Sequence, residues 1–223
     1  MNPICIIPAR GGSKGIPNKN IIDFNNHPLL SYSITQALSS SFIQEVYVSS
    51  DSDQILDIAQ QYGAFPIIRP LNISGDKASS EEALTHTINQ ISTPFDTVVF
   101  LQPTSPLRTS FDIDKCLSDF YSKKLDSLFS SCELEDCLIW EDSNGNLSSI
   151  NYNFNNRKRR QDHLPQLVEN GSIYIFNKKG YIQNKNRLFG KIGHTIMESW
   201  KMFEIDNFED LELCSFLYKK NLK

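Results

Sequence analysis

The chain has 223 residues, of which 39% are hydrophobic and 22% charged, and its formal net charge is −4. This length can bury a full hydrophobic core, and the composition is typical of a soluble globular protein. The negative net charge argues against a nucleic-acid-binding protein, so an anion site must come from local clustering of cations. No apolar run reaches the roughly 18 residues of a membrane helix, and a signal-peptide pattern is absent. The five cysteines lack metal-ligand spacing, which favours reduced thiols and a cytoplasmic protein.

The first predicted strand, residues 4–7, is apolar and rich in β-branched side chains, as buried strands are. It runs into residues 10–20, which contain three glycines and three cations. Glycines let backbone N–H groups turn toward an anion, and open α/β folds bind ligands at the carboxyl ends of strands. We therefore interpret residues 10–20 as a triphosphate cradle. Neither G-x-x-x-x-G-K-[ST] nor G-x-G-x-x-G is present, so composition alone would equally allow a glycine-rich surface loop.

Helical and strand patterns then alternate along the chain. Helices are expected at 29–38, 53–62, 80–88, 113–120 and 208–217, and strands at 45–49, 65–69, 97–101, 125–132, 171–176 and 202–206. This alternation predicts an α/β fold with a doubly wound, mainly parallel sheet. Asp51 and Asp53 imitate a D-x-D metal motif, but a helix start explains them better, so we interpret them as structural.

The alternation breaks between residues 133 and 168. Asn144-Gly145 predicts a hairpin there, and residues 151–160 are polar and basic. Without a repeat or a flexible linker, we expect one domain, 1–223, with 133–168 as an excursion from it. The basic run 157–160 also fits a solvated face or an RNA-binding patch, but sparse aromatic residues and the acidic chain disfavour RNA.

Glu204 and Asp206 lie two residues apart in the expected strand 202–206, so both would face one side while Phe203 and Ile205 point into the core. Two carboxylates on one face need a compensating cation, and oxygen ligands suit Mg²⁺. The alternative is a solvated acidic strand end before a helix that Asn207 caps.

Four blocks in this order carry a resemblance to a known family: IPARGGSKGIPNKN, FLQPTSPLR, RRQD with ENGSIYIF, and FEID. The chain resembles the CMP-sialic acid synthetases (N-acylneuraminate cytidylyltransferases) and their legionaminate and pseudaminate relatives. The resemblance implies a Rossmann-like nucleotidyltransferase fold and a homodimer with a protruding dimerisation hairpin. It also implies Mg²⁺-dependent transfer of CMP from CTP to the anomeric hydroxyl of a nonulosonic acid for cell-surface glycans such as capsule or lipopolysaccharide. N-acylneuraminate is the expected acid. The alternatives are legionaminate or another nonulosonate and, less favoured, a different sugar such as a sugar phosphate.

The resemblance also assigns roles to residues of this chain. CTP contacts are implied for Arg10, Gly11, Gly12, Lys14, Lys19, Asn20, Arg69 and Ser80, and sugar contacts for Gln102, Thr104, Ser105, Arg160, Asn170 and Tyr174. The implied catalytic residues are Arg10, Lys19, Gln102 and Asp206, and the implied metal ligands are Glu204 and Asp206. Because the excursion exchanges between subunits in this family, Arg160, with Arg159 as the alternative, would serve its own site or the partner's. No nucleic acid or membrane partner is implied.

Overall fold

The computed structural model describes residues 2–133, 137–162 and 165–222, with the backbone but not the side chain of Arg160. The strands of its main sheet are β1 (Pro3–Pro8), β4 (Glu45–Ser50), β5 (Phe65–Ile68), β6 (Thr97–Leu101), β7 (Ser127–Glu133), β10 (Leu167–Asn177) and β11 (Ile192–Ile196). The helices are α1 (Leu29–Leu38), α2 (Asp53–Gln61), α3 (Ser80–Gln90), α4 (Ser110–Ser122), α5 (Lys178–Asn184) and α6 (Phe208–Asn221). Two short pairs, β2 (Asp23–Phe24) with β3 (His27–Pro28) and β8 (Trp140–Ser143) with β9 (Asn146–Ser149), lie outside the main sheet.

Within the described residues the main sheet has seven strands in the order β11-β7-β10-β6-β1-β4-β5. The pairs β1–β4, β1–β6, β4–β5 and β7–β11 are parallel, whereas β10 runs antiparallel to both β6 and β7. The α/β fold with a mainly parallel sheet is therefore confirmed. β10 is reversed because the excursion after β7 returns the chain to the sheet at the end where β7 leaves it, so that Leu167 pairs with Glu133.

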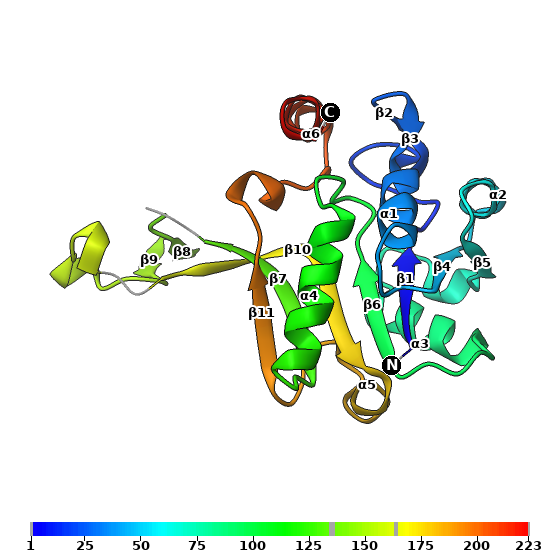
Figure 1. The fold of residues 1–223 in the computed structure, drawn as a ribbon. Coiled ribbons are helices and arrows are strands. Elements are labelled where there is room, and N and C mark those ends of the chain that lie inside the picture. The colour runs from blue at the N-terminus through cyan, green and yellow to red at the C-terminus, as the bar shows by residue number, and fades with distance from the viewer. Residues whose placement is uncertain (1, 134–136, 163–164, 223) are drawn as a thin grey trace.

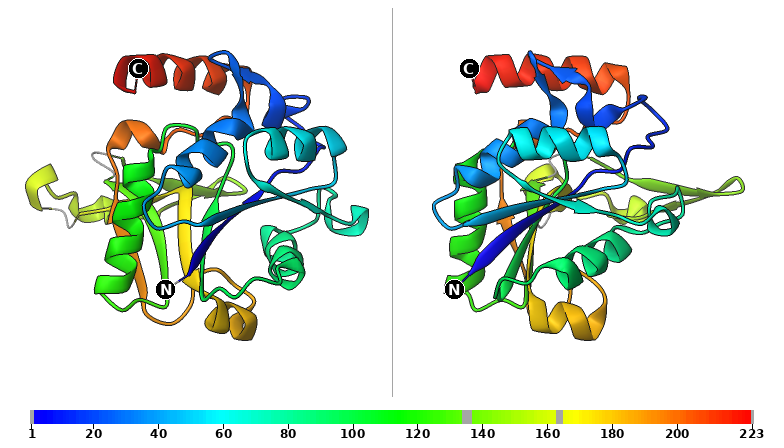
Figure 2. Two further views of the ribbon diagram at one scale, coloured as in Figure 1. Left: turned by 45° about the vertical axis from the view of Figure 1, so that its right-hand side comes forward. Right: turned by 90° about the vertical axis from the view of Figure 1, so that its right-hand side faces the viewer.

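Helices cover both faces of the sheet (Figures 1 and 2). Successive side chains of β1 point to opposite faces, so Cys5 and Ile7 pack with residues of α1, α2 and α4 while Ile4 and Ile6 pack with residues of α3 and α5. A third apolar cluster joins α6 to the segments that follow β1 and β6. It lies beyond the carboxyl-terminal ends of these strands (Figure 1). No helix in the described part of the chain is both long and apolar enough to span a membrane.

The expected strand at 202–206 is wrong. Ser199–Met202 forms a 3-10 helix, and the following residues are irregular. The amide N–H of Ile205 donates to the carbonyl of Thr104 at 2.8 Å, in the loop after β6, and not to a neighbouring strand. Ile205 is buried as expected, whereas Phe203 is 39% exposed and not in the core.

The predicted hairpin is present as β8–β9, and it projects from the body of the molecule (Figure 1). Asn144 and Gly145 both have positive φ, 55° and 87°, as the tight turn of such a hairpin requires. The strand β10 begins on this projecting side and continues into the centre of the sheet, so one strand connects the excursion to the core.

Candidate active site

A pocket of about 530 Å³ opens at the carboxyl-terminal ends of β1, β5 and β6. Its walls are the loop after β1, the segment from β5 to the start of α3, the loop after β6, and one residue near the carboxyl end of the chain. The predicted site residues that line it are Arg10, Lys14, Lys19, Asn20, Arg69, Ser80, Gln102, Thr104 and Asp206. The fold thus brings into one cavity six of the eight predicted CTP residues (all but Gly11 and Gly12), two predicted sugar residues and one predicted metal ligand.

The loop after β1 presents its cations to the acidic residue Asp76, which sequence reasoning missed. The Asp76 carboxylate lies 3.0 Å from the Arg10 guanidinium and 3.3 Å from the Lys14 ammonium. The hydrogen bond from Lys14 is the main cause that lowers the pKa of the Asp76 carboxyl, and Arg10 adds to it. One carboxylate therefore already occupies the position that an anionic ligand of these cations would take.

Two other polar contacts shape the same loop. The Asn20 side chain donates to the Arg10 carbonyl at 2.9 Å, and the Gly11 amide donates to the Asp51 carboxylate at 2.9 Å. The helix cap expected of Asp51 is therefore not what it provides: Ser52 stands at the N-cap of α2, without a side-chain bond. Asp51 instead holds the start of the glycine loop.

The glycines of the loop differ in what surrounds them. A Cβ on Gly15 would collide with the Asp206 carbonyl, and a Cβ on Gly11 would lie 3.0 Å from the Ser52 Cβ. A Cβ on Gly12 would meet no protein atom within 4 Å. The close approach that requires glycine is therefore at Gly15, where the loop packs against the carboxyl-terminal segment.

Arg69 is the most unusual cation of the pocket because it is buried, with 6% of its surface exposed. Its Nε and Nη2 atoms have no hydrogen-bond partner among the described residues, and the Asp51 carboxylate is 3.8 Å away. Burial is the main cause that lowers the pKa of Arg69. Buried polar groups are almost always hydrogen-bonded, so these nitrogens need an acceptor from water or from a ligand.

Ser80 lines the pocket at the first turn of α3. The N-cap of that helix is Ser79, whose side chain accepts from the Glu82 amide, while the Glu82 carboxylate accepts from the Ser79 amide. These two bonds form a capping box at the start of the helix. Ser80 is not its cap, which leaves the Ser80 hydroxyl available to a ligand.

The loop after β6 is held from below by Arg108, which is 1% exposed. Its guanidinium donates to the carbonyls of Ser105 at 2.7 Å and Gln102 at 2.9 Å. Burial lowers the pKa of Arg108 to about 10. The backbone of the loop is thereby fixed, and Gln102 and Thr104 are presented to the pocket.

The two predicted metal ligands lie in different surroundings. The Asp206 carboxylate is at the pocket wall, largely exposed, and 2.7 Å from the Lys19 ammonium. The Glu204 carboxylate is bonded by the hydroxyls of Ser105 at 3.3 Å and Thr104 at 3.4 Å. Burial is the main cause that raises the pKa of Glu204, and the charge of Asp206 adds to the rise.

A comparison with known families decides what kind of protein carries this pocket. The family model described as "Cytidylyltransferase" matches residues 4–221 of the chain. The chain belongs to the cytidylyltransferase family.

Curated relatives of this cytidylyltransferase act on nine-carbon sugar acids by name. The pseudaminic acid cytidylyltransferase of Campylobacter jejuni is 35% identical, over 99% of this chain and 98% of the relative. The N-acylneuraminate cytidylyltransferase of Escherichia coli O18:K1:H7 is 33% identical, over 97% of this chain and 52% of the relative. The solved structure of CMP:2-keto-3-deoxy-manno-octonic acid synthetase complexed with CTP superposes with a TM-score of 0.75 over 100% of both chains. At 19% identity it supports the fold.

Some predicted sugar contacts of the cytidylyltransferase do not line the pocket. Asn170 is buried, where its amide donates to sulfur atoms of Cys132 and Met197 and its oxygen accepts from Ser130. Tyr174 is buried, and its hydroxyl donates to Glu169 at 2.5 Å. Asn170 lies beside the β-bulge of β10, and its assignment as a direct sugar contact stays a prediction.

The remaining sugar-site prediction concerns Arg160. It begins a 3-10 turn, Arg160–Asp162, on the excursion, and its side chain lies outside the described residues. One more cation, Arg187, lies behind a wall of the pocket, and no motif in the sequence pointed to it. Arg187 stacks on the rings of Phe100 and Tyr174, at 4.7 and 4.9 Å, and its Nε donates to Glu81 at 2.8 Å. Phe100 is itself a wall of the pocket.

Proposed function

We propose that this cytidylyltransferase transfers CMP from CTP to the anomeric hydroxyl of a nonulosonic acid and releases pyrophosphate. One observation carries the proposal: the lining of one pocket divides between cations, among them Arg69 with two buried nitrogens that make no hydrogen bond to the described residues, and the uncharged polar side chains of Gln102 and Thr104. Such a division suits a donor with a triphosphate and an acceptor rich in hydroxyl groups. The relatives named above supply the class of acceptor.

Among the cations of the pocket, Arg10 and Lys19 would neutralise the phosphates of CTP and the charge that develops on the leaving pyrophosphate. Phosphoryl-group transfer depends on positioning and charge stabilisation more than on covalent catalysis by side chains. The ion pairs of these cations with Asp76 and Asp206 support this role, because they hold both side chains near the cavity before any ligand enters. The two Arg69 nitrogens that make no hydrogen bond to the described residues would donate to an oxygen of the nucleotide.

The uncharged side chains of Gln102 and Thr104 would bind hydroxyl and carboxylate oxygens of the sugar acid. Amide and hydroxyl groups both donate and accept, which suits a polyol. Neither Gln102 nor Thr104 carries the positive charge that would suit a phosphate group on the acceptor. A phosphorylated acceptor is therefore the less favoured alternative.

Glu204 and Asp206 would supply carboxylate oxygens to Mg²⁺. This ion prefers oxygen ligands and is usually bound by one or two carboxylates together with substrate phosphates and water. The described residues contain no cluster of three or more acidic, histidine or cysteine ligands, so the substrate would complete the coordination. When bound, the ion would neutralise phosphate charge and help to align the reacting groups. Lys19 would keep Asp206 at the mouth of the triphosphate end.

The test is pyrophosphate release from CTP and Mg²⁺ with a panel of N-acetylneuraminic, pseudaminic and N,N'-diacetyllegionaminic acids, and with a hexose 1-phosphate as the contrasting acceptor. Release with at least one nonulosonic acid, and none with the sugar phosphate, is expected. The three acids are separate arms because the relatives named for two of them are 35% and 33% identical. The proposal would be overturned if pyrophosphate were released with the sugar phosphate alone, or if none of the acceptors led to release.

The proposal extends to assembly, with residues 133–168 as the dimerisation segment of a cytoplasmic homodimer. The hairpin and the residues after it expose Leu147, Ile150 and Phe154 by 64, 61 and 54%. Side chains of this size are costly to leave in water as a group. A second copy of the chain, whose projecting hairpin would meet the same surface, is the proposed occupant.

A further inference from the structure

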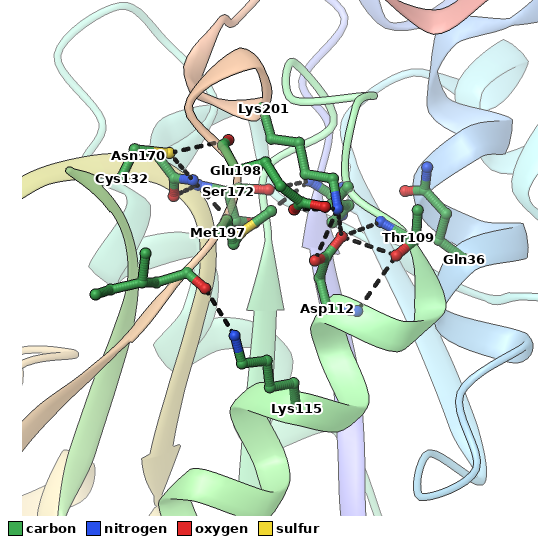
Figure 3. A network of polar contacts seen from close by, with 12 residues as sticks. Gln36, Thr109, Asp112, Lys115, Cys132, Asn170, Ser172, Met197, Glu198 and Lys201 are labelled. Carbon is green, nitrogen blue, oxygen red and sulfur yellow. Dashed lines mark hydrogen bonds and ion pairs between the residues drawn. The ribbon is translucent and has the colours of Figure 1, made fainter. Parts of the chain in front are cut away.

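Behind the pocket, two oppositely charged side chains are buried against each other. The Lys201 ammonium lies 2.9 and 2.8 Å from the two carboxylate oxygens of Asp112. Each side chain has only 4 or 5% of its surface exposed. The Glu198 carboxylate, which is largely exposed, approaches the same ammonium at 2.7 Å (Figure 3). Neither partner lines the pocket, so the pair does not contact a substrate directly.

Asp112 is tied to the loop after β6. Its carboxylate accepts from the amide and the hydroxyl of Thr109, at 2.7 and 2.8 Å, and so completes the capping box at the start of α4. Thr109 directly follows Arg108, whose guanidinium binds the carbonyls of Gln102 and Ser105. The position of Asp112 is therefore coupled to the loop that presents Gln102 and Thr104.

Lys201 is tied to the carboxylate segment. It lies three residues before Glu204, at the end of the 3-10 helix Ser199–Met202. A second tie is the hydrogen bond from the Ile205 amide to the Thr104 carbonyl, at 2.8 Å. The segment that carries Glu204 and Asp206 is thus fastened to the region 102–112 on each side of Glu204, in addition to the bonds from Thr104 and Ser105 to the Glu204 carboxylate itself.

Stability alone does not account for such a pair. A buried ion pair loses so much hydration that apolar residues of similar size are often equally stabilising. Its distinctive property is geometric: two carboxylate oxygens and one ammonium define the separation of the segments that bear them. An apolar contact would allow these segments to slide.

We propose that Asp112 and Lys201 are positioning residues that set the distance of the Glu204 and Asp206 carboxylates from the loop 102–108. The inference rests on the proposed function, since those carboxylates are its metal donors. Loss of the pair would leave the pocket present but its two halves misaligned. A change of this kind affects metal binding and turnover more than nucleotide affinity.

The test compares the double variant Asp112→Asn, Lys201→Met with the wild-type protein. Asparagine keeps an acceptor oxygen for Thr109, and methionine keeps the length of the lysine stem, so α4 and the packing are preserved. Binding of Mn²⁺ in the presence of CTP, followed by electron paramagnetic resonance, should weaken roughly tenfold. Turnover should fall about 100-fold, as small misplacements of reacting groups do, while KM for CTP stays near the wild-type value.

Lys115→Met is the matched control. Lys115 is on the same helix and donates to the Ile196 carbonyl at 3.0 Å (Figure 3), away from the segments in question. It should keep wild-type Mn²⁺ affinity and turnover. Lys201→Met alone should unfold at a lower temperature than the double variant, because it leaves the Asp112 carboxylate buried without its cation.

Wild-type Mn²⁺ affinity in the double variant would overturn the inference, and so would an equal loss in Lys115→Met. The outcome is separable from the proposed function. If the wild-type protein releases no pyrophosphate with any sugar acid, the proposed function fails, whereas Mn²⁺ binding with CTP still tests the position of the carboxylates.

Discussion

Lys19 is the residue whose contacts distinguish it from the other loop cations. It is 14% exposed and paired with Asp206, whereas Lys14 is 74% exposed. Lys19→Ala should lower kcat/KM roughly 100-fold, because a positioned charge near the phosphates is lost. The unfolding temperature should change little, since the partner is exposed and such pairs contribute little stability.

Steady-state pyrophosphate release and thermal unfolding measure the two effects. Lys14→Ala is the control on the same loop and should cost far less activity. Equal losses in both variants would show that the loop acts through its net charge and not through a specific contact of Lys19.

Glu204 offers a prediction about stability and pH in the metal-free protein. Burial, with the charge of Asp206, raises the pKa of this carboxyl above the usual 4.5. A folded-state pKa above the unfolded one means that the folded state binds the proton more tightly. The resulting stabilisation is complete below the unfolded pKa and is lost as the pH rises through the folded one.

Glu204→Gln should therefore be more stable than the wild type at neutral pH, and the difference should shrink as the pH falls. Thermal unfolding in a chelator across this range measures it. A variant that is less stable at neutral pH would show that the hydrogen bonds from Thr104 and Ser105 outweigh burial of the charge.

At the scale of elements, two glycines of the loop after β1 should respond differently to an added side chain. Gly15→Ala should destabilise the protein, because the added Cβ collides with the Asp206 carbonyl, a backbone atom. Gly12→Ala should leave the unfolding temperature unchanged, because open space surrounds that position. If Gly12→Ala nevertheless raises KM for CTP, the predicted approach of phosphate to this glycine is supported. Unchanged kinetics would remove it from the site.

Elements with a strong local pattern were predictable from the sequence. The helix at 29–38, the strand at 97–101 and the Asn144-Gly145 hairpin are present as expected, because periodicity and turn chemistry are local properties. The strand expected at 202–206 is absent because its alternating pattern has a different cause. Ile205 is buried in the apolar cluster that joins α6 to the segments after β1 and β6, and its amide bonds the carbonyl of Thr104, 101 residues earlier in the sequence.

The candidate site was predictable as a set of residue types but not as contacts. Arg10, Lys19 and Asp206 could be proposed from motifs and they meet in one pocket. The pairing of Asp76 with Arg10, and the Asp112–Lys201 pair, carry no motif. They depend on how distant loops pack, which spacing along one sequence does not encode.

At the scale of the whole molecule, the proposed dimer can be tested together with the role of Arg160. Replacing Leu147 and Ile150 by Asp should convert the dimer to a monomer in light scattering, because two exposed apolar side chains of the hairpin would become charged. The matched control is Leu71→Asp, which alters an even more exposed leucine, 79%, far from the hairpin. A protein that is monomeric before any substitution would contradict the assembly.

If Arg160 serves the partner's site, inactive Arg160→Ala and Lys19→Ala proteins should regain activity when their subunits are exchanged. A mixed dimer would then carry both defects in one site and leave the other intact. Exchange without recovery would place Arg160 in the site of its own subunit. Pyrophosphate release after unfolding and refolding of the mixture measures the recovery.

The ion pair between Lys19 and Asp206 joins residues 187 positions apart in a chain of 223. Contacts between such distant residues are the last that a growing chain can make, and closing them is slow compared with local structure. The loop after β1 is synthesised early, but Asp206, which lines the same pocket, is present only after residues 203–206 have been added. A chain that has grown only as far as residue 202 therefore lacks the Asp206 partner of Lys19, and the proposed site is complete only when residues 203–206 have been added.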